Sequence, residues 1–424
     1  MATAALRHSS SKTIVVALSG GVDSSVAAAL LRPCKALHMT NWTHDDTLTC
    51  SSISDALDAE RVAQHLDISL ERVSLEQDYW HAVFEPYLEG LLQGRRGNPD
   101  VDCNRFVKFG ALRDYVREKH GEHACLATGH YARLLRYGDD GWDDVVRSRP
   151  WLSNNDEQPI LCAAVDATKD QSYFLASCTA SQLDNVLFPL GELTKKEGTR
   201  RLAKHYNLPT AEKRESMGLC FVGKRPDGWA SFIQEYLPAL SKEPLRVYDV
   251  DTNELLEVRE GHQACLYTRG QGAKVAGRAQ KYFCVQSDIR SNELWVGAGT
   301  HHPALYADSL VVEQVHWTSE VCPEPLQETQ SMRVQCRIRH LQPLMDCTLH
   351  RASDDSLEVV FDRPVRGMAQ GQWAVFYDGP VCLGGGPIER SGPSYSDRSL
   401  PLDLLAPSGH NDKSLEGLRQ RAIL

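Results

Sequence analysis

The residues best suited to chemistry near the start of the chain are Ser19-Gly20-Gly21-Val22-Asp23-Ser24. They follow an apolar run at residues 12–18 and precede an Ala- and Leu-rich stretch at residues 24–31, as in a strand, turn and helix. Glycines let the backbone approach a phosphate closely, while serine hydroxyls and the N–H groups at a helix start hold the anion. A Gly-Gly hairpin or a helix cap is the structural alternative, but this combination is rare by chance. The segment therefore predicts a phosphate-binding loop, in which Asp23 orients the backbone or meets a magnesium ion.

Two cysteines lie in polar segments rich in Gly and Asp, at positions 103 and 220. Asn98-Pro99-Asp100 is typical of a turn that leads into a helix, so we expect Cys103 in or near a first helical turn. There the helix dipole and free N–H groups favour the thiolate. Asp100 lies three residues earlier and is a candidate general acid/base or orienting group. The other cysteines are expected to be small buried hydrophobic residues, and the chain has no C-x-x-C pair that would indicate a metal site.

Strand and helix patterns alternate over residues 12–130. The strands and helices that they predict must position these groups. Further strands are predicted at residues 36–40, 70–75 and 124–128, and helices at residues 55–66 and 79–92. This alternation predicts an α/β fold with a doubly wound parallel sheet, which binds ligands at the C-terminal ends of its strands.

From about residue 213, short β-rich runs separated by Gly, Pro and Asp predict two smaller β-rich modules, a central β domain and a C-terminal β-barrel. The predicted strands are at residues 263–268, 282–285, 293–296, 333–338, 347–349, 357–361 and 373–377. The expected domains are a nucleotide-binding catalytic domain at 12–212, a central domain at 213–302 and a barrel at 303–390. Residues 391–424 are expected to form a loose tail.

Composition limits the possible functions. The 424 residues carry a formal net charge of −10, which argues against a protein that coats nucleic acid non-specifically but allows a local basic groove. The longest apolar runs are of strand length, so we expect no membrane partner. Residues 1–11 contain Arg7, His8 and several hydroxyl residues but no acid, which is compatible with a mitochondrial presequence or with a disordered start.

The pattern Ser-Gly-Gly-x-Asp-Ser resembles the PP-loop of the N-type ATP pyrophosphatases, which cleave ATP between its α and β phosphates and adenylate an oxygen. The resemblance implies ATP with Mg2+, and it implies Met39 and Gly129 as neighbours of the adenosine. The implied phosphate-side contacts are Ala17, Leu18, Ser19, Gly20, Gly21, Val22, Asp23 and Ser24. The loop alone leaves open a PP-loop ligase that adenylates a small molecule.

Longer motifs resemble the tRNA-specific 2-thiouridylases, in the family's order, from about residue 12 to 390. They lie at residues 98–104, 106–110, 169–175 and 215–223. The resemblance implies ATP-dependent 2-thiolation of the wobble uridine 34 of tRNA, with Cys103 as nucleophile, Cys220 as persulfide carrier and Asp100 as proton-transfer residue. Sulfur would come from a cysteine desulfurase or a sulfur relay protein. Either the persulfide attacks C2 directly, or Cys103 first releases hydrosulfide.

The same resemblance implies a set of tRNA contacts, namely Asn98, Pro99, Asp100, His130, Lys169, Asp170, Gln171, Ile338, Arg339 and Gln372. Independently, Arg333, Arg337 and Arg339 alternate with apolar residues. We therefore expect them to project from one face of a strand toward a phosphate backbone, with a solvated face as the alternative.

Some positions depart from the family pattern. Arg96-Gly97 replaces the usual Thr-Pro, and the segment Tyr267–Gln271 lacks the Arg-Lys-Gly that usually follows, which leaves the role of the central module open. Met217 resembles the eukaryotic mitochondrial members, which favours a mitochondrial location over a cytoplasmic one. A catalytically inactive tRNA-binding protein is disfavoured, because the loop residues and both cysteines are retained.

Overall fold

The computed structural model describes residues 12–42, 51–155, 158–194, 198–214, 228–237, 243–352 and 356–399. Its first sheet has the strand order β3-β2-β1-β4-β7, and every neighbouring pair is parallel. The strands are β1 (Ile14–Ala17), β2 (Lys35–Thr40), β3 (Leu70–Ser74), β4 (Cys125–Ala127) and β7 (Val186–Leu187). The predicted α/β fold with a parallel sheet is confirmed.

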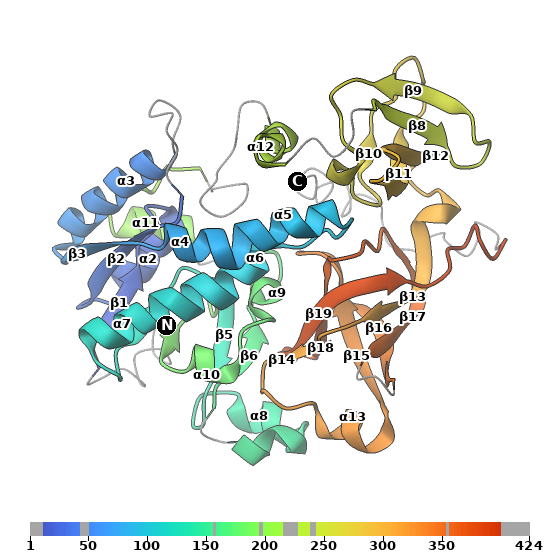
Figure 1. Cartoon of the computed structure of the whole chain (residues 1–424). Coiled ribbons are helices and arrows are strands. Elements are labelled where there is room, and N and C mark those ends of the chain that lie inside the picture. The colour runs from blue at the N-terminus through green and yellow to red at the C-terminus, as the bar shows by residue number, and fades with distance from the viewer. Residues whose placement is uncertain are drawn as a thin grey trace.

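Helices cover both faces of this sheet because successive side chains of a strand point to opposite sides. Ile14 and Val16 pack in an apolar cluster with α2 (Val22–Leu30), α3 (Ser51–Leu66) and α11 (Thr199–His205). Val15 packs in a second cluster with the helices of the other face. Those helices are α4 (Glu76–Tyr79), η1 (Trp80–Phe84), α5 (Glu85–Leu92), α6 (Pro99–Asp102), η2 (Cys103–Ala111) and α7 (Leu112–His120). Figure 1 shows two long helical rods beside the sheet, one running from α4 to α5 and the other from α6 to α7.

The segment between β4 and β7 links the α/β part to the barrel. It begins with the hairpin of β5 (Ala132–Leu135) and β6 (Ile160–Ala163). The loop of this hairpin contains α8 (Trp142–Arg147) and η3 (Pro150–Asn155). After the hairpin come α9 (Ser172–Leu175) and α10 (Ala180–Leu183). Strand β6 pairs with the last barrel strand through Val381 and Cys162. One sheet therefore joins residues 132–163 to barrel strands more than 140 positions later, which the sequence patterns did not predict.

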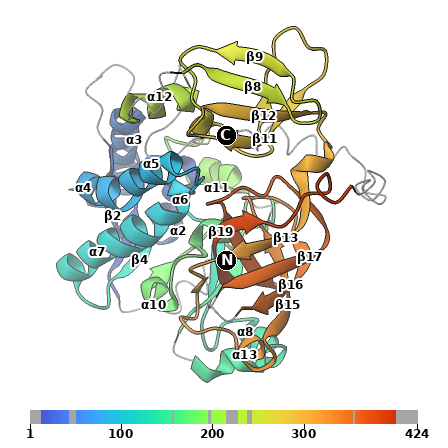
Figure 2. The ribbon, with the colours of Figure 1, turned by 45° about the vertical axis from the view of Figure 1, so that its right-hand side comes forward.

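The second sheet has the order β10-β11-β12-β8-β9 and lies above the barrel in both views (Figures 1 and 2). Its strands are β8 (Leu245–Asp249), β9 (Leu255–Arg259), β10 (Gly272–Ala273), β11 (Tyr282–Asp288) and β12 (Glu293–Ala298). The helix α12 (Gly228–Tyr236) precedes it. The strand predicted at residues 263–268 is wrong: Ala264–Leu266 form the short helix η4, where Ala264 N donates to Asn292 Oδ1 at 2.8 Å.

The barrel strands are antiparallel, and the ring closes because β13 pairs with both β17 and β19. They are β13 (Tyr306–Val312), β14 (His316–Trp317), β15 (Ser331–Arg337), β16 (Met345–Arg351), β17 (Leu357–Arg366), β18 (Trp373–Asp378) and β19 (Val381–Ser391). The short η5 (Pro303–Leu305) and α13 (Glu324–Thr329) complete this part.

The loose tail predicted from residue 391 is corrected for residues 391–399. Gly392 N donates to Ser309 O at 2.8 Å, Tyr395 N donates to Tyr306 O at 3.0 Å, and the Tyr395 side chain is buried. Residues 400–424, like the predicted presequence at 1–11, lie outside the described residues. Among the helices that the structure describes, none combines the length and apolarity needed to cross a bilayer.

Candidate active site

The predicted phosphate loop joins the end of β1 to the start of α2. Ser24 Oγ and Ser25 Oγ donate to Gly21 O at 3.1 and 2.7 Å, which holds the turn closed. Gly20 has a φ of +78°, a conformation that glycine adopts without strain. No side chain caps the N-terminus of α2, so the helix start faces the loop. Ser19 is exposed, with its hydroxyl 3.0 Å from Ser24 Oγ. This geometry suits an anion.

The residues expected around adenosine lie on the strands that flank this loop. Met39 is near the end of β2, Gly129 follows β4, and β2 and β4 both pair with β1. A Cβ atom at Gly129 would lie 2.8 Å from Ser24 N, so only glycine allows the two backbones to approach this closely. The C-terminal ends of the three strands thus form one surface, as nucleotide-binding α/β sheets require.

Two side chains that the sequence analysis did not single out hold the loop in place. The Tyr131 hydroxyl donates to Asp23 Oδ1 at 2.8 Å. Lys213 Nζ donates to Gly20 O at 3.0 Å and also contacts Asp55 Oδ1 and Asp58 Oδ2, at 2.8 and 2.5 Å. Lys213 lies shortly before residues 215–227, which include the predicted carrier Cys220 and lie outside the described residues.

Cys103 lies where α6 passes into η2, at the end of the first turn, as predicted from Asn-Pro-Asp. Asn98 caps this helix: its Oδ1 accepts from Asp100 N at 3.1 Å. The backbone N–H of Cys103 is already bonded within the helix, so it is not a free donor for the thiolate.

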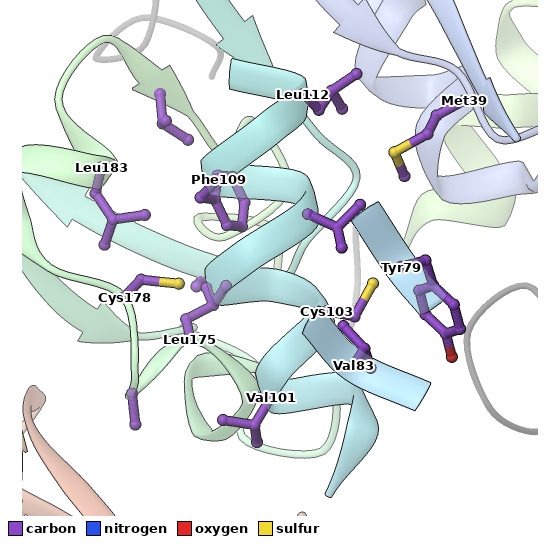
Figure 3. Packing of buried hydrophobic residues seen from close by; sticks show 14 of the residues in the cluster. Met39, Tyr79, Val83, Val101, Cys103, Phe109, Leu112, Leu175, Cys178 and Leu183 are labelled. Carbon is purple, nitrogen blue, oxygen red and sulfur yellow. The ribbon is translucent and has the colours of Figure 1, made fainter. Parts of the chain in front are cut away.

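The surroundings of Cys103 differ from the polar context expected from its neighbours in sequence. The residue is fully buried and packs in the apolar cluster of α4–α7. Figure 3 shows its sulfur pointing toward the side on which Met39 and Tyr79 lie. The side chain of Asn41 lies beside it, with Nδ2 4.0 Å from the sulfur. The thiol therefore faces the end of β2, beside the nucleotide surface.

His130 lies at the same edge, half-buried between Phe109 and Phe188, with ring centroids 5.7 and 5.8 Å away. Its Nδ1 is 2.7 Å from Thr128 Oγ1. Burial, aided by the Lys108 charge, holds the pKa of His130 well below its usual value. His130 is therefore a neutral hydrogen-bonding group rather than a cation for phosphate.

The structure separates the three residues of the Lys-Asp-Gln motif. Lys169 is half-buried, with its Nζ 5.7 Å from the centroid of the Tyr131 ring. Asp170 is 1% exposed and forms an ion pair with Arg337 at 3.1 Å. The ion pair with Arg337 therefore occupies the Asp170 side chain, and the contact of this residue with tRNA stays a prediction. Gln171 N donates to Tyr131 O at 2.7 Å, and Gln171 Oε1 accepts from Tyr131 N at 3.0 Å.

The predicted row of arginines on a strand face is also wrong. Arg333 is exposed and forms an ion pair with Asp362 across the sheet, whereas Arg337 is buried against Asp170. Arg339 lies beyond the end of β15, and its Nη2 donates to Arg269 O and Gly367 O at 2.9 and 2.8 Å. It links the barrel to the loop that precedes β10.

The two remaining predicted tRNA contacts lie near each other but differ in exposure. The Ile338 side chain is buried, and its carbonyl oxygen accepts from the Tyr173 hydroxyl at 3.3 Å. The Ile338 side chain therefore packs in the barrel core, and the contact of this residue with tRNA stays a prediction. Gln372 is half-buried, and its Nε2 donates to Arg96 O at 3.1 Å.

Arg96, one of the departures from the family pattern, has a clear structural role. Its backbone N donates to Gln370 O at 2.7 Å, while its buried guanidinium donates to Tyr267 O and Ala264 O. The segment before Asn98 is thus fixed to both β-rich parts. No local sequence pattern marks such a contact. Asn41 and Tyr131 are easier to find from the sequence, because Asn41 follows the predicted strand at residues 36–40 and Tyr131 follows Gly129 and His130.

The fold and the loop define an α/β nucleotide-binding domain followed by a β-barrel. The family model described as tRNA methyl transferase HUP domain matches residues 12–224, and the aminomethyltransferase beta-barrel domain model matches residues 307–388. The chain belongs to the family of tRNA-specific 2-thiouridylases, as the following relatives show.

The chain is 38% identical to the mitochondrial tRNA-specific 2-thiouridylase 1 of Mus musculus over 401 residues. The aligned region covers 92% of this chain and 93% of the relative. It is also 38% identical over 391 residues to the tRNA-specific 2-thiouridylase MnmA of Shigella boydii serotype 18, covering 89% of this chain and 97% of the relative. The recognition of the family from its motifs is thereby confirmed.

Proposed function

We propose that this protein uses ATP to activate the wobble uridine 34 of tRNA at O2 and then replaces that oxygen with sulfur. The observation that carries this proposal is the position of Cys103. Its sulfur is 4.0 Å from Asn41 Nδ2, just beyond the end of β2, and β2 pairs with the strand that leads into the phosphate loop. A nucleophile therefore adjoins the nucleotide surface.

In the first step, the phosphate loop holds ATP while the uracil O2 attacks the α phosphate and pyrophosphate leaves. The uncapped start of α2 and the close approach at Gly129 fit the phosphates and the adenosine. The Asp23 carboxylate would hold Mg2+, which supplies charge neutralisation at the leaving pyrophosphate. Tyr131 orients that carboxylate by its hydrogen bond.

In the second step, Cys220 carries sulfur as a persulfide from a cysteine desulfurase or a sulfur relay protein. In one route, the terminal sulfur attacks C2 and displaces AMP, and Cys103 then attacks the Cys220 sulfur. In the other, Cys103 attacks first and releases hydrosulfide, which displaces AMP. Both routes end in a Cys103–Cys220 disulfide, which an external thiol must reduce. Asp100, in the same helical turn as Cys103, would take the N3 proton that uracil loses on adenylation and return it after AMP leaves.

The tRNA surface is proposed to surround the Cys103 helix start. Asn98, Pro99 and Asp100 would lie beside the flipped base, because they form the start of that helix. Other contacts would come from nearby residues with partly accessible side chains, namely His130, Lys169, Gln171, Arg339 and Gln372. Cys103 is buried, so uridine 34 must leave the base stack to reach it. Proteins read unpaired RNA bases in this splayed-out state.

We also propose a mitochondrial location, with the cytoplasm as the alternative. Met217 and the name of the mouse relative support it.

The direct test is mass spectrometry of nucleosides from tRNA incubated with the protein, ATP, Mg2+ and a persulfide donor. We expect the mass gain of an oxygen-to-sulfur exchange on the wobble uridine, with AMP and pyrophosphate as products. Asp23→Ala should abolish tRNA-dependent pyrophosphate release. Formation of ADP and phosphate would contradict the adenylation step.

The unequal roles of the cysteines have a separate test. Cys220→Ala should block persulfide loading from a sulfur donor, with or without tRNA, whereas Cys103→Ala should still load. Both variants should bind ATP and fail to thiolate tRNA, and the double variant should behave as Cys220→Ala because the steps are sequential. A stable persulfide on Cys103 in the Cys220→Ala variant would reverse the two roles.

A further inference from the structure

Asn41 is a buried amide at the point where the nucleotide surface and the nucleophile meet. It directly follows β2, which ends at Thr40, and its side chain is 1% exposed. Burying an amide is unfavourable unless both of its ends are hydrogen-bonded. Each end of this side chain therefore calls for a partner.

The nitrogen end of Asn41 has a partner in Cys103. Its Nδ2 donates to the sulfur at 4.0 Å, at the long end for a hydrogen bond to sulfur. An N–H donor stabilises the negative charge of a thiolate. The backbone N–H of Cys103 is used within the helix, and Asp100 N is bonded to Asn98 Oδ1. Asn41 therefore supplies a donor that the helix start itself does not.

The oxygen end of Asn41 is different: among the described residues, no donor reaches Oδ1. The chemistry of the target base limits what can fill this place. Around C2 of uracil, N1 carries the ribose, O2 is an acceptor, and N3–H is the sole donor. A carbonyl oxygen that lies beside C2 of the base can therefore accept a hydrogen bond from the base only at N3–H.

We propose that Asn41 is a positioning and base-selecting residue, which holds the Cys103 thiolate with Nδ2 and accepts the N3–H of the target uracil with Oδ1. The inference rests on the proposed function, since it takes uracil as the base at Cys103. Cytosine has an unprotonated N3, which would face Asn41 Oδ1 acceptor to acceptor. The amide thus selects uracil and holds its C2 beside Cys103, where sulfur is released, in one contact.

Asn104 provides a matched control on the helix next to Cys103. It is also 1% exposed, and its Oδ1 also has no partner among the described residues. Its Nδ2, however, donates to Asp100 O and Phe174 O, at 2.8 and 3.3 Å, rather than to the thiol. Asn104→Ala thus removes a buried amide of the same kind without touching the proposed contact.

The first experiment measures the alkylation rate of Cys103 against pH in the full chain, with mass spectrometry of the peptide to separate it from other thiols. Burial lowers the alkylation rate by the same factor at every pH. The midpoint of the rate–pH profile therefore reports the ionisation of the Cys103 thiol. We expect Asn41→Ala to move the midpoint up by about one pH unit, and the shape-conserving Asn41→Asp to move it up further. Asn104→Ala should leave it in place. An unchanged midpoint in both Asn41 variants would overturn the thiol contact.

The second experiment measures binding of an anticodon stem-loop that carries uridine or N3-methyluridine at position 34, without ATP. The wild-type protein should bind the methylated loop at least about tenfold more weakly, and Asn104→Ala should keep that ratio. In Asn41→Ala the ratio should fall to within about twofold. A ratio retained in Asn41→Ala would overturn the base contact. Failure of the wild-type protein to bind the uridine loop at all would instead contradict the proposed function.

Discussion

The hydroxyl of Tyr131 donates a hydrogen bond of 2.8 Å to Asp23 Oδ1 in the phosphate loop. A tyrosine has one hydroxyl proton, so the neighbouring Thr199 hydroxyl must donate to Tyr131 in turn. The backbone of Tyr131 is held on both sides by Gln171, through its N–H and its Oε1. A proposed tRNA-contacting segment is thus connected to the ATP loop through one aromatic side chain.

Tyr131→Phe removes only the hydroxyl, so it should leave the fold intact and release Asp23. A hydrogen bond to a charged group is worth about 1.5–3 kcal/mol, and solvent replaces part of it. We expect about a tenfold rise in the KM for ATP, measured by tRNA-dependent pyrophosphate release. Tyr137→Phe is the control, since Tyr137 is 67% exposed. Equal KM values in the two variants would show that the loop does not depend on this bond.

Gly129→Ala tests whether the segment after β4 must touch the start of α2. The added Cβ would lie 2.8 Å from Ser24 N, and overpacking of this kind costs about 1–3 kcal/mol. We expect a lower melting temperature and at least about a tenfold loss of pyrophosphate release. Gly272→Ala is the matched control, because no atom lies within 4 Å of its added Cβ. Full activity of Gly129→Ala would argue against nucleotide binding at this contact.

The burial of Asp170 separates stability from tRNA binding. Asp170→Ala leaves the Arg337 guanidinium buried without its partner, which should lower the free energy of unfolding by about 3–5 kcal/mol. Lys169→Ala should change stability by less than about 1 kcal/mol and weaken tRNA binding, with a flatter salt dependence. Chemical denaturation and tRNA titration measure the two effects. A stable Asp170→Ala variant with weak tRNA binding would instead support the predicted tRNA contact of Asp170.

The contact between Arg105 and His316 predicts a loss of stability in acid. Arg105 Nη1 lies 2.9 Å from His316 Nε2, which must be unprotonated to accept the bond. Burial, with the Arg105 charge, lowers the pKa of His316 to about 4. The unfolded chain therefore takes up this proton first, so the contribution is complete above about pH 6.5 and is lost as the pH falls toward 4.

Thermal unfolding at pH 8 and pH 5 measures this effect. His316→Gln has no imidazole to titrate, so its melting temperature should fall less between the two pH values than that of the wild-type protein. An equal fall in both proteins would place the acid sensitivity elsewhere.

Several features follow from the sequence because short-range physics specifies them. The strand, Gly-Gly turn and helix at residues 12–31 form as predicted, since the preferences of a continuous apolar run and of glycine act within a few residues. Asn-Pro-Asp starts the Cys103 helix for the same reason: Asn98 caps the first turn and Pro99 fits the first helical position.

Other features depended on groups brought together from distant parts of the chain. The alternating arginines of β15 carry no sign that Asp170 lies beneath Arg337, because the two residues are 167 positions apart. Similarly, β6 joins the barrel through β19, and the segment 263–268 turns into a short helix against Asn292. The sequence by itself determined which residues could bind phosphate and carry a reactive thiol. Only the tertiary structure decided that Cys103 is buried beside Asn41, since long-range packing sets the surroundings of a side chain.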